Sequence, residues 1–575
     1  YWSLTLSVAL LITAVLSPIL GTISDLMRGK KRFLSIFVGI GVVGTAALVL
    51  VGTGDWLLAS AVMIVARIGF TGANTFYDAL LPHVAREADQ DAVSTRGYAM
   101  GYLGGGLLLA INVVMIFQLG FEEGARWSFL SVALWWALFS IPIFRQVPEP
   151  PAAVAKLADG VHVATASFQR IWETLKDARR YRELFKFLIA FLIYNDAIGT
   201  IIGVAAIYGT ELGFSATELI LALLLVQFVG IPFSLIFGWL PSRTKTRRPF
   251  YLAFILFNLV ALPVVGMVGA QVLPQSLTGV LLPPYETVAE AVGTGVYSVQ
   301  DAAVKLEGGW GPVVAADDPA ETGGDRAYVV SRDPLAGVTF HFYGQEVVIT
   351  YNSGPDLGQW QALLDGEPVW TEDADGAAVP LIIDAYSAAP RYGLTQMVAA
   401  EEAGEHLLQI IGLEIRNPAS SSGFLSVAGF EVLAPVSASS LPAILGLILA
   451  VQAVGLVFAW LIGQRLVAGW VTGLDTQRSI LLALVVYSVI AVWGFILRST
   501  IEFWFLAWMV AMVQGGSQAL SRSLYATLSP ASKSGEFFGL FGVMEKFSAF
   551  LGPLIFALAV ALFGSSRPAI LALNA

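Results

Sequence analysis

Twelve apolar stretches, each about as long as a membrane-spanning helix, recur along the chain and are separated by polar segments. About 20 helical residues cross the hydrocarbon core of a bilayer, so this pattern predicts twelve transmembrane helices. The stretches cover residues 3–21, 33–53, 56–80, 97–118, 127–145, 184–208, 216–240, 249–270, 441–463, 479–497, 502–528 and 536–563.

The segment between the eighth and ninth stretches, residues 275–437, has a different pattern. Strand-like runs such as GVTFHFYG and EVVITYN alternate with turn formers such as NSGPD and LDGEP, which is typical of short β-strands. The predicted fold class is therefore a mainly α membrane protein, a helix bundle with an inserted all-β domain of the sandwich or jelly-roll type.

Composition supports a polytopic membrane protein whose two parts differ in charge. Of the 575 residues, 56% are hydrophobic and 13% are charged, whereas soluble domains carry about 25% charged residues. Residues 275–437 hold 22 acidic and 5 basic side chains, and the rest of the chain holds 20 acidic and 27 basic. A mildly basic part that contacts the lipid bilayer thus carries an acidic, water-facing domain.

Basic residues gather in alternate connections between the apolar stretches, which sets the topology. These connections are GKKR (29–32), the stretch Arg145–Lys186 and SRTKTRR (242–248). The positive-inside rule makes them cytoplasmic and leaves residues 275–437 on the other side. We expect a multi-pass protein of the cytoplasmic (inner) membrane of a prokaryote, with 275–437 extracytoplasmic.

The connection 146–183 is longer than the others and divides five apolar stretches from seven. It opens with several prolines and continues as TASFQRIWETLKDARRYRELFKF. This sequence is typical of a basic amphipathic helix, and we expect it to lie on the anionic inner leaflet.

A compact charged turn, GTISDLMRGKKRF, joins the first two apolar stretches. Its pattern is Gly21-x-x-x-Asp25-x-x-Arg28-Gly29-Lys30-Lys31. A carboxylate at a helix end can cap the N-terminus of another helix, and basic groups can pair with helix C-termini. A simpler interpretation is a positive turn that only sets orientation. The turn resembles the signature loop between the second and third helices of the major facilitator superfamily. This resemblance implies a cytoplasmic gate, held by breakable contacts between two moving halves.

Further segments resemble the vacuole-effluxer-like branch of that superfamily. The resemblance implies a twelve-helix secondary transporter, with fungal relatives that export amino acids from the vacuole. On its register the predicted helices are the second to the eleventh plus two extra ones beside the β-domain, and the first and last helices are lost at truncated ends. The segments are ANTFYDALLPHVA (73–85), STRGYAMGYLGGGLLL (94–109), LIYNDAIGT (192–200), VQGGSQALSRSLYATLSP (513–530) and GEFFGLFGVMEKFSAFLGPL (535–554).

The second half departs from the family pattern at its own gate loop. Ser242 stands where the resemblance implies an acidic residue, while a second candidate loop, GWVTGLDTQR (469–478), carries Asp475. The sequence leaves open which loop has this role. The expected domains are a first transporter half (1–145), a cytoplasmic linker (146–183), the start of the second half with one extra helix (184–274), the β-domain (275–437), and the second extra helix with the rest of the second half (438–575).

Polar side chains at bilayer depth are costly unless they face a cavity or a partner, so each is a functional hypothesis. Asn195 and Asp196 lie near the middle of one stretch, and Glu545 and Lys546 lie at similar depth in the last. We expect Asp196 and Lys546 to face each other and to bind a zwitterionic substrate or a proton. The alternative is a static ion pair that only fixes packing.

Two further helices carry polar stripes. Gln514, Gln518 and Arg522 recur at intervals of four residues, which places them on one helix face. Arg522 lies near the cytoplasmic end, where it could gate the protein or extend to the membrane surface. In the stretch 56–80, Arg67, Asn74 and Asp78 fall on roughly one face.

The β-domain resembles the galactose-binding-like β-sandwiches attached to bacterial surface proteins. The resembling segments are EGGWGPV (307–313), NSGPDLGQWQALLDGEPV (352–369) and RNPASSSGFLSVAGFEVL (416–433). The resemblance implies a surface glycan as partner, bound by aromatic stacking and polar hydrogen bonds, although aromatic side chains are also core residues. The candidate contacts are Trp310, Tyr328, Trp360, Tyr386, Arg391 and Tyr392.

Several kinds of chemistry are not expected. The chain has no cysteine, and its four histidines are scattered, so neither a disulfide nor a multi-histidine metal site is predicted. No nucleophile–base pattern is present. We therefore expect no enzyme activity, no cofactor and no nucleic-acid partner.

These patterns and resemblances together predict a secondary active transporter of small solutes that works by rocker-switch alternating access. The family resemblance alone makes amino-acid efflux the leading activity. Protons are the candidate coupling ion, and the outer domain is expected to be an accessory that binds a glycan or another ligand. The alternative is a membrane-anchored glycan-binding or sensor protein whose bundle does not transport. Asp196 and Lys546 favour transport, because an inert anchor needs neither.

Overall fold

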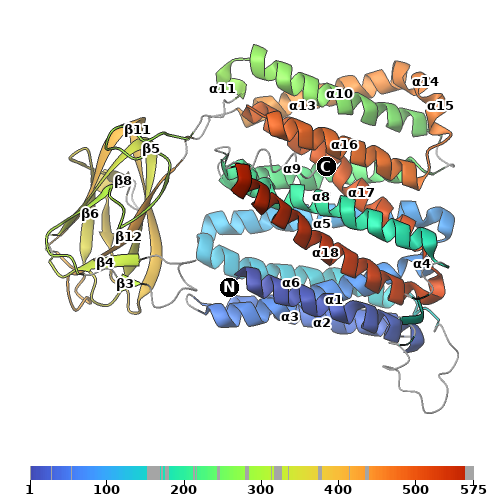
Figure 1. Cartoon of the computed structure of the whole chain (residues 1–575), viewed down its shortest axis with the longest axis horizontal. Helices are drawn as coiled ribbons and strands as arrows, with labels where there is room; N and C mark the ends of the chain where they lie inside the picture. The colour runs from blue at the N-terminus through green and yellow to red at the C-terminus, as the bar shows by residue number, and fades with distance from the viewer. Residues whose placement is uncertain are drawn as a thin grey trace.

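The structure is a computed structural model. It consists of two separate parts, a bundle of long helices and an antiparallel β-domain (Figure 1). The structure describes residues 2–563 except 28, 53–54, 152–168, 170–171, 175, 177–179, 212–213, 215, 243–245, 279–283, 312–313, 316–326, 334–335, 373–377, 414, 434 and 436–439.

The bundle divides into two halves on either side of the connection 146–183. The first half contains α1 (Trp2–Met27), α2 (Lys30–Ala47), α3 (Trp56–Ala79), α4 (Leu81–Val84), α5 (Gln90–Leu119) and α6 (Phe121–Gln146). The second half contains α8 (Arg182–Glu211), α9 (Ala216–Trp239), α10 (Arg248–Val272), α11 (Gln275–Thr278), α13 (Leu441–Phe458), α14 (Gln464–Leu466), α15 (Ala468–Val471), α16 (Thr476–Ile496), α17 (Thr500–Leu528) and α18 (Ser534–Phe563).

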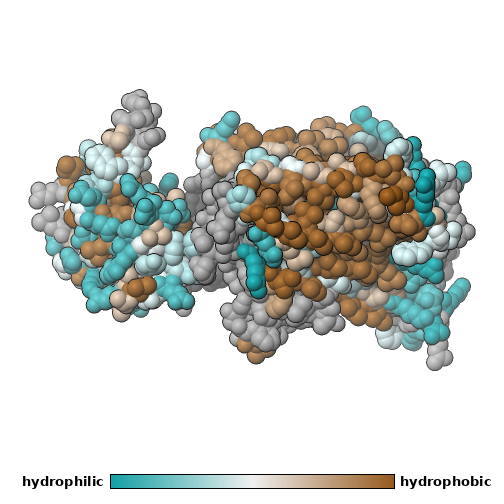
Figure 2. All heavy atoms as spheres, turned by 90° about the horizontal axis from the view of Figure 1, so that it is seen from above, coloured by the Kyte–Doolittle hydropathy of each residue, from teal (hydrophilic) through white to brown (hydrophobic). Residues whose placement is uncertain are grey.

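Twelve of these helices have the length that the apolar pattern predicts. Within the described part of the chain, nine are both long and apolar enough to cross a membrane. The other three, α1, α17 and α18, have 26, 29 and 30 residues. Figure 2 shows a broad apolar band over the bundle, with polar residues towards the end away from the β-domain. The predicted helix bundle is confirmed.

The two halves meet along a few helix pairs. From the first half, α1 and α3 pack on α18, and α5 packs on α9 and α17. The two extra helices, α10 and α13, pack on each other and on α17 at the edge of the second half (Figure 1). A buried hydrogen bond from Gln452 Nε2 to Asn258 Oδ1 (2.7 Å) ties this pair together.

The β-domain is built around two long strands, β5 (Gly337–Ser353) and β11 (Arg391–Gly412), which pair in antiparallel register from Gly337–Ile411 to Ser353–Arg391. The main sheet has the order β10-β6-β11-β5-β12-β4-β3, with β1 beside β12, β2 beside β5 and β7 beside β6. The other strands are β1 (Gly295–Ser298), β2 (Val304–Glu307), β3 (Val314–Ala315), β4 (Ala327–Ser331), β6 (Gln359–Leu364), β7 (Glu367–Pro368), β8 (Trp370–Glu372), β9 (Ala378–Pro380), β10 (Ile382–Asp384) and β12 (Leu425–Val432).

Alternate residues of these strands fill the core of the β-domain. Phe340, Phe342 and Phe430 are fully buried, and the rings of Phe340 and Phe430 stack with centroids 4.5 Å apart. The predicted all-β domain is thus confirmed, and its finer sandwich assignment stays a prediction. The domain lies beyond the end of the bundle opposite to α4 and α15 (Figure 1). The end that carries α4 and the α1–α2 turn is called the basic end below.

Candidate functional site

Asp25 joins the two halves at the basic end. Its side chain lies at the end of α1 and is only 1% exposed. The carboxylate accepts hydrogen bonds from the backbone N–H groups of Gly535 (3.0 Å) and Glu536 (2.9 Å), in the first turn of α18. These N–H groups have no partner within their own helix, and the helix dipole favours an anion there. Lys30 Nζ, 2.5 Å from Asp25 Oδ1, supplies the countercharge. Asp25 therefore caps a helix of the opposite half.

Glycines allow this contact by bringing α1 and α18 together backbone to backbone. A Cβ atom at Gly21 would lie 2.7 Å from the carbonyl carbon of Gly535 and closer still to its oxygen. One turn further along, a Cβ at Gly539 would lie 2.7 Å from Pro18 Cα. Any larger residue at Gly21 would hold the two helices apart and pull the cap of Asp25 out of reach.

Among the other residues of the charged turn, Lys31 has a different role from the one expected. Lys31 Nζ donates to the carbonyls of Phe144 (2.9 Å) and Val147 (2.5 Å) at the end of α6, and Lys31 N donates to Glu149 (3.1 Å). Because α2 and α6 belong to the same half, the prediction that Lys31 is part of a latch between halves is wrong. Gly29 lies just before α2 with an ordinary φ of −134°. Arg28 lies outside the described residues.

Arg522 makes a second junction between the halves. It projects from α17, is 6% exposed, and pairs with Asp78 of α3 at 3.0 Å. Its Nε atom donates to Ser94 Oγ of α5 at 3.0 Å. The guanidinium also lies over the rings of Tyr77 and Tyr98, 5.4 and 5.0 Å from their centroids. Burial of Arg522 against α3 and α5 shows that it does not extend to the membrane surface, one of the two roles the sequence left open.

The predicted midplane residues lie on α8 and α18. Lys546 Nζ forms an ion pair with Glu545 (3.1 Å) on its own helix, and both charges lie within Coulombic range of Asp78. Asp196 is 9% exposed on α8, and Asn195 beside it is half-buried. Among the described ion pairs, Lys546 is joined to Glu545, so its expected pairing with Asp196 stays a prediction.

The remaining predicted membrane residues are more open. Gln514 and Gln518 are half-buried on α17. Arg67 and Asn74 are exposed on α3, whereas Asp78, on the same stripe, is turned towards α17 by its ion pair. The structure therefore separates Asp78 from the other two members of this predicted stripe.

Sequence reasoning missed a polar cluster at the start of α5. Asp91 accepts hydrogen bonds from Ser523 Oγ of α17 (2.5 Å) and from Thr476 Oγ1 of α16 (2.7 Å). Thr527 Oγ1 of α17 donates to Gln90 Oε1 (3.0 Å). The apolar pattern predicts that this helix begins near residue 97, but it begins at Gln90, because its first two turns are buried in a polar junction rather than in lipid. The sequence signal that could have revealed this cluster is the acidic residue Asp91 in the polar first turn of α5.

The structure distinguishes the two candidate gate loops of the second half by their contacts. A Cβ atom at Gly238 of α9 would lie 2.7 Å from Thr95 Cβ of α5, so the Thr95 side chain packs closely on the backbone of α9. Ser242 follows Gly238 at the same spacing as Asp25 follows Gly21. Asp475 instead accepts from Arg478 N (2.8 Å) and caps its own helix.

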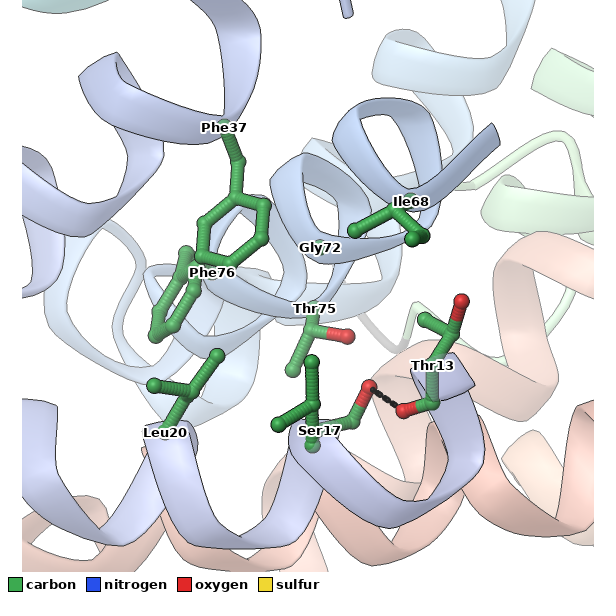
Figure 3. A pocket seen from close by; sticks show the side chains of 9 residues that line it. Thr13, Ser17, Leu20, Phe37, Ile68, Gly72, Thr75 and Phe76 are labelled. Atoms are coloured by element: carbon green, nitrogen blue, oxygen red, sulfur yellow. Dashed lines mark hydrogen bonds between the residues drawn. The ribbon is translucent and has the colours of Figure 1, made fainter. Parts of the chain in front are cut away.

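A small pocket lies between α1, α2 and α3, close to the junction of α1 with α18 (Figure 3). Ser17 Oγ, which donates to Thr13 O (2.8 Å), lies on one wall, and Phe37 and Phe76 close the other side. Its volume of about 10 Å³ is at the lower limit for holding a single water molecule. This pocket is too small for a substrate.

The candidate ligand residues of the β-domain separate into core and surface. Trp360 is 1% exposed, so the prediction that it contacts a ligand is wrong and it belongs to the core. The indole N–H of Trp310 donates to the carbonyls of Glu307 and Gly337. Tyr328 and Tyr392 lie together with ring centroids 5.8 Å apart. Arg391 is exposed and Tyr386 is half-buried.

Comparison with known proteins gives a consistent relationship for the bundle. Residues 1–280 and 425–575 match the family described as "Vacuole effluxer Atg22 like". The MFS-type transporter YxiO of Bacillus subtilis is 36% identical over 267 residues, 45% of this chain and 61% of YxiO. Autophagy-related protein 22 of Kluyveromyces lactis is 24% identical over 260 residues, 42% of this chain and 53% of that protein.

Other similarities are narrower. Autophagy-related protein 22-2 of Neosartorya fischeri is 26% identical over 198 residues, 31% of this chain and 32% of that protein. The chain thus matches less than two thirds of the length of each of these relatives. A solved two-domain esterase active on acetylated mannans shares 15% identity over 24% of this chain and 36% of the esterase, with a TM-score of 0.18. That likeness is too weak to support any inference about this chain.

Proposed function

Because the chain belongs to the Atg22-like branch of the major facilitator superfamily, whose members are membrane transporters and not enzymes, we propose that it carries amino acids across the membrane by rocker-switch alternating access. The halves that move are α1–α6 and α8–α18. The polar junction at the basic end is the gate that must separate when the substrate site opens to the cytoplasm.

One observation carries this proposal: the junction is held by reversible polar contacts rather than by apolar packing alone. Asp25 caps α18, and Arg522 pairs with Asp78. Each contact links residues that lie more than 400 positions apart, on opposite halves. Hydrogen bonds and ion pairs that water can replace when the halves part are suited to a gate, because the open state leaves no orphaned charge.

The substrate class is supported by the chemistry of the deeper residues. A zwitterionic amino acid offers one ammonium group and one carboxylate, which a carboxylate and a cation of the protein can bind. Asp196 and Glu545 are the proposed acceptors and Lys546 the proposed donor, with Gln514 and Gln518 as neutral polar contacts. A proton is the proposed coupling ion. The description of the family as vacuole effluxers favours export as the direction.

Location follows from the same topology. We place the basic end in the cytoplasm of a prokaryotic cell and the β-domain outside the inner membrane, because basic connections stay on the cytoplasmic side. The β-domain lies at the opposite end of the bundle from the proposed gate (Figure 1). We assign it an accessory role in binding a surface glycan, with Tyr328 and Tyr392 as its stacking residues.

Proteoliposomes test this function. Purified protein would be reconstituted and supplied with a panel of labelled amino acids, with and without a pH gradient. We expect saturable movement of at least one amino acid, faster with the gradient. A folded and inserted protein that moves no member of the panel above the rate of empty vesicles would contradict the proposal and support a bundle that only anchors the β-domain.

A further inference from the structure

Two carboxylates of the gate, Asp25 and Asp91, have hydrogen-bond partners that differ in kind. Asp25 faces two backbone N–H groups and the ammonium of Lys30, which can only donate hydrogen bonds. Asp91 faces the hydroxyl groups of Ser523 and Thr476. A hydroxyl group can donate or accept, so Asp91 can be satisfied both as a carboxylate and as a neutral acid. Asp25 can be satisfied only as a carboxylate.

The charged side chains near Asp91 bind other groups. Arg522, one residue before Ser523 on α17, binds Asp78 and Ser94. On α16, Asp475 and Arg478 belong to the cap of that helix. The other described acidic, basic or histidine side chains on α5 and on the elements packed against it are Arg96 of α5, Glu87 and Asp89 just before it, His83 of α4, Glu218 of α9, Glu123, Arg126 and Arg145 of α6, and Glu502 of α17. Of these, Glu87, Asp89 and Arg96 are exposed, and Arg126 pairs with Glu123. Arg248 of α10 binds the carbonyls of Leu240, Val471 and Leu474. The hydrogen-bond partners of Asp91 in the described part of the chain are thus two hydroxyl groups, Ser523 and Thr476, and not a cation.

We propose that Asp91 is a proton-binding residue of the gate, so that a proton from the cytoplasm stabilises the state closed at the basic end. This inference rests on the proposed function. In the closed state Asp91 is half-buried between α5, α16 and α17 without a cation, which disfavours its charged form. When the halves separate, both hydroxyl contacts break and water reaches the carboxylate, which favours the charged form. By linkage, acid therefore shifts the equilibrium towards the closed gate.

The chemical step is a proton transfer alone. Cytoplasmic water supplies the proton, the Asp91 carboxylate becomes a carboxylic acid, and one of the two hydroxyl groups turns from donor to acceptor. On opening, the acid returns the proton to water. No other bond forms or breaks.

Spin labels on the two halves would measure the gate directly. Ala88 and Ala531 are exposed on opposite sides of the junction, and the chain has no cysteine that would interfere. Ala88→Cys and Ala531→Cys would be combined in one protein, which would be spin-labelled and placed in nanodiscs. The distance between the two labels would be measured by pulsed electron–electron double resonance between pH 8 and pH 5. We expect the ratio of short to long distances to rise by roughly tenfold as the pH falls, the factor that ~1.4 kcal/mol of differential interaction produces.

Three variants separate a proton site from a structural contact. Asp91→Asn, which resembles the neutral acid, should hold the short distance at every pH, and Asp91→Glu should restore the pH dependence. Asp89→Asn, on the exposed segment beside it, should behave as the wild type. An unaltered pH response in Asp91→Asn, or none in the wild type, would overturn the inference. If Asp91→Asn does not fold, the test rests on how the label distances of the wild type and of Asp91→Glu depend on pH. A wild type that transports amino acids but shows no distance change would refute the inference and leave the proposed function intact.

Discussion

The close approach of α1 and α18 makes Gly21→Ala a sensitive test of the gate. The new methyl group would lie 2.7 Å from the carbonyl carbon of Gly535, where ordinary carbon–carbon contact needs about 3.5–4.0 Å. The helices must therefore part by roughly 1 Å. The bonds from Gly535 N and Glu536 N to Asp25, now 3.0 and 2.9 Å, then approach about 4 Å and are lost.

The cost falls on the closed state alone. Overpacking costs about 1–3 kcal/mol, and each lost hydrogen bond to a charge costs about 1.5–3 kcal/mol, part of which water returns in the open state. A net cost of only about 2 kcal/mol lowers the ratio of closed to open gate by roughly thirtyfold. The helix itself should not suffer, because alanine is the better helix former by about 1 kcal/mol.

The assay is the distance distribution between labels at Ala88 and Ala531, combined with amino-acid transport in proteoliposomes. Gly21→Ala should shift the distribution to long distances and slow transport, while its thermal unfolding stays near that of the wild type. Gly29→Ala is the matched control, because its Cβ would meet only the Phe33 ring at an ordinary 3.5 Å. Equal distance distributions in Gly21→Ala and Gly29→Ala would refute the gate geometry.

Three further perturbations test other parts of the proposal. Arg522→Lys keeps the charge but loses the planar contact with Asp78 and the two tyrosine rings, so transport should fall at least tenfold; wild-type transport would show that charge alone suffices. Asp196→Asn should abolish the pH dependence of transport while membrane insertion is retained, and an unaltered pH profile would assign Asp196 a packing role. Residues 275–437, expressed alone, should fold as a soluble monomer with β-type circular dichroism, because their core is complete without the bundle; an aggregated or unfolded product would show that the domain needs the membrane part.

The sequence predicted features whose signal is local. The twelve helices and the β-domain follow from hydropathy and strand patterns that a short window contains. Asp25 could be predicted as a gate residue because its sequence neighbours on both sides belong to one recognisable turn. Even there the motif did not separate Lys30, which neutralises Asp25, from Lys31, which ties α2 to α6. That distinction depends on which helix end lies opposite each side chain.

Features that depend on distant partners could not be predicted. Asp91 meets Ser523 and Thr476 across 432 and 385 positions, and no spacing rule reaches that far. Arg522 allowed two interpretations because its depth in the helix is compatible with both, and only the positions of α3 and α5 decide between them. Trp360 was a candidate ligand residue because an aromatic side chain can lie either in a core or on a binding face. The register of its strand places it in the core.

Cross-linking of the two halves tests most directly whether the basic end is a gate. His83 Nε2 of α4 and Ser534 Oγ of α18 lie 3.1 Å apart across the junction. His83→Cys and Ser534→Cys would be combined and joined by a short, reducible bifunctional thiol reagent, with each single variant as a control. Transport should stop when the halves are joined, return when the link is reduced, and stay unchanged in the treated single variants. Undiminished transport by fully cross-linked protein would contradict the account.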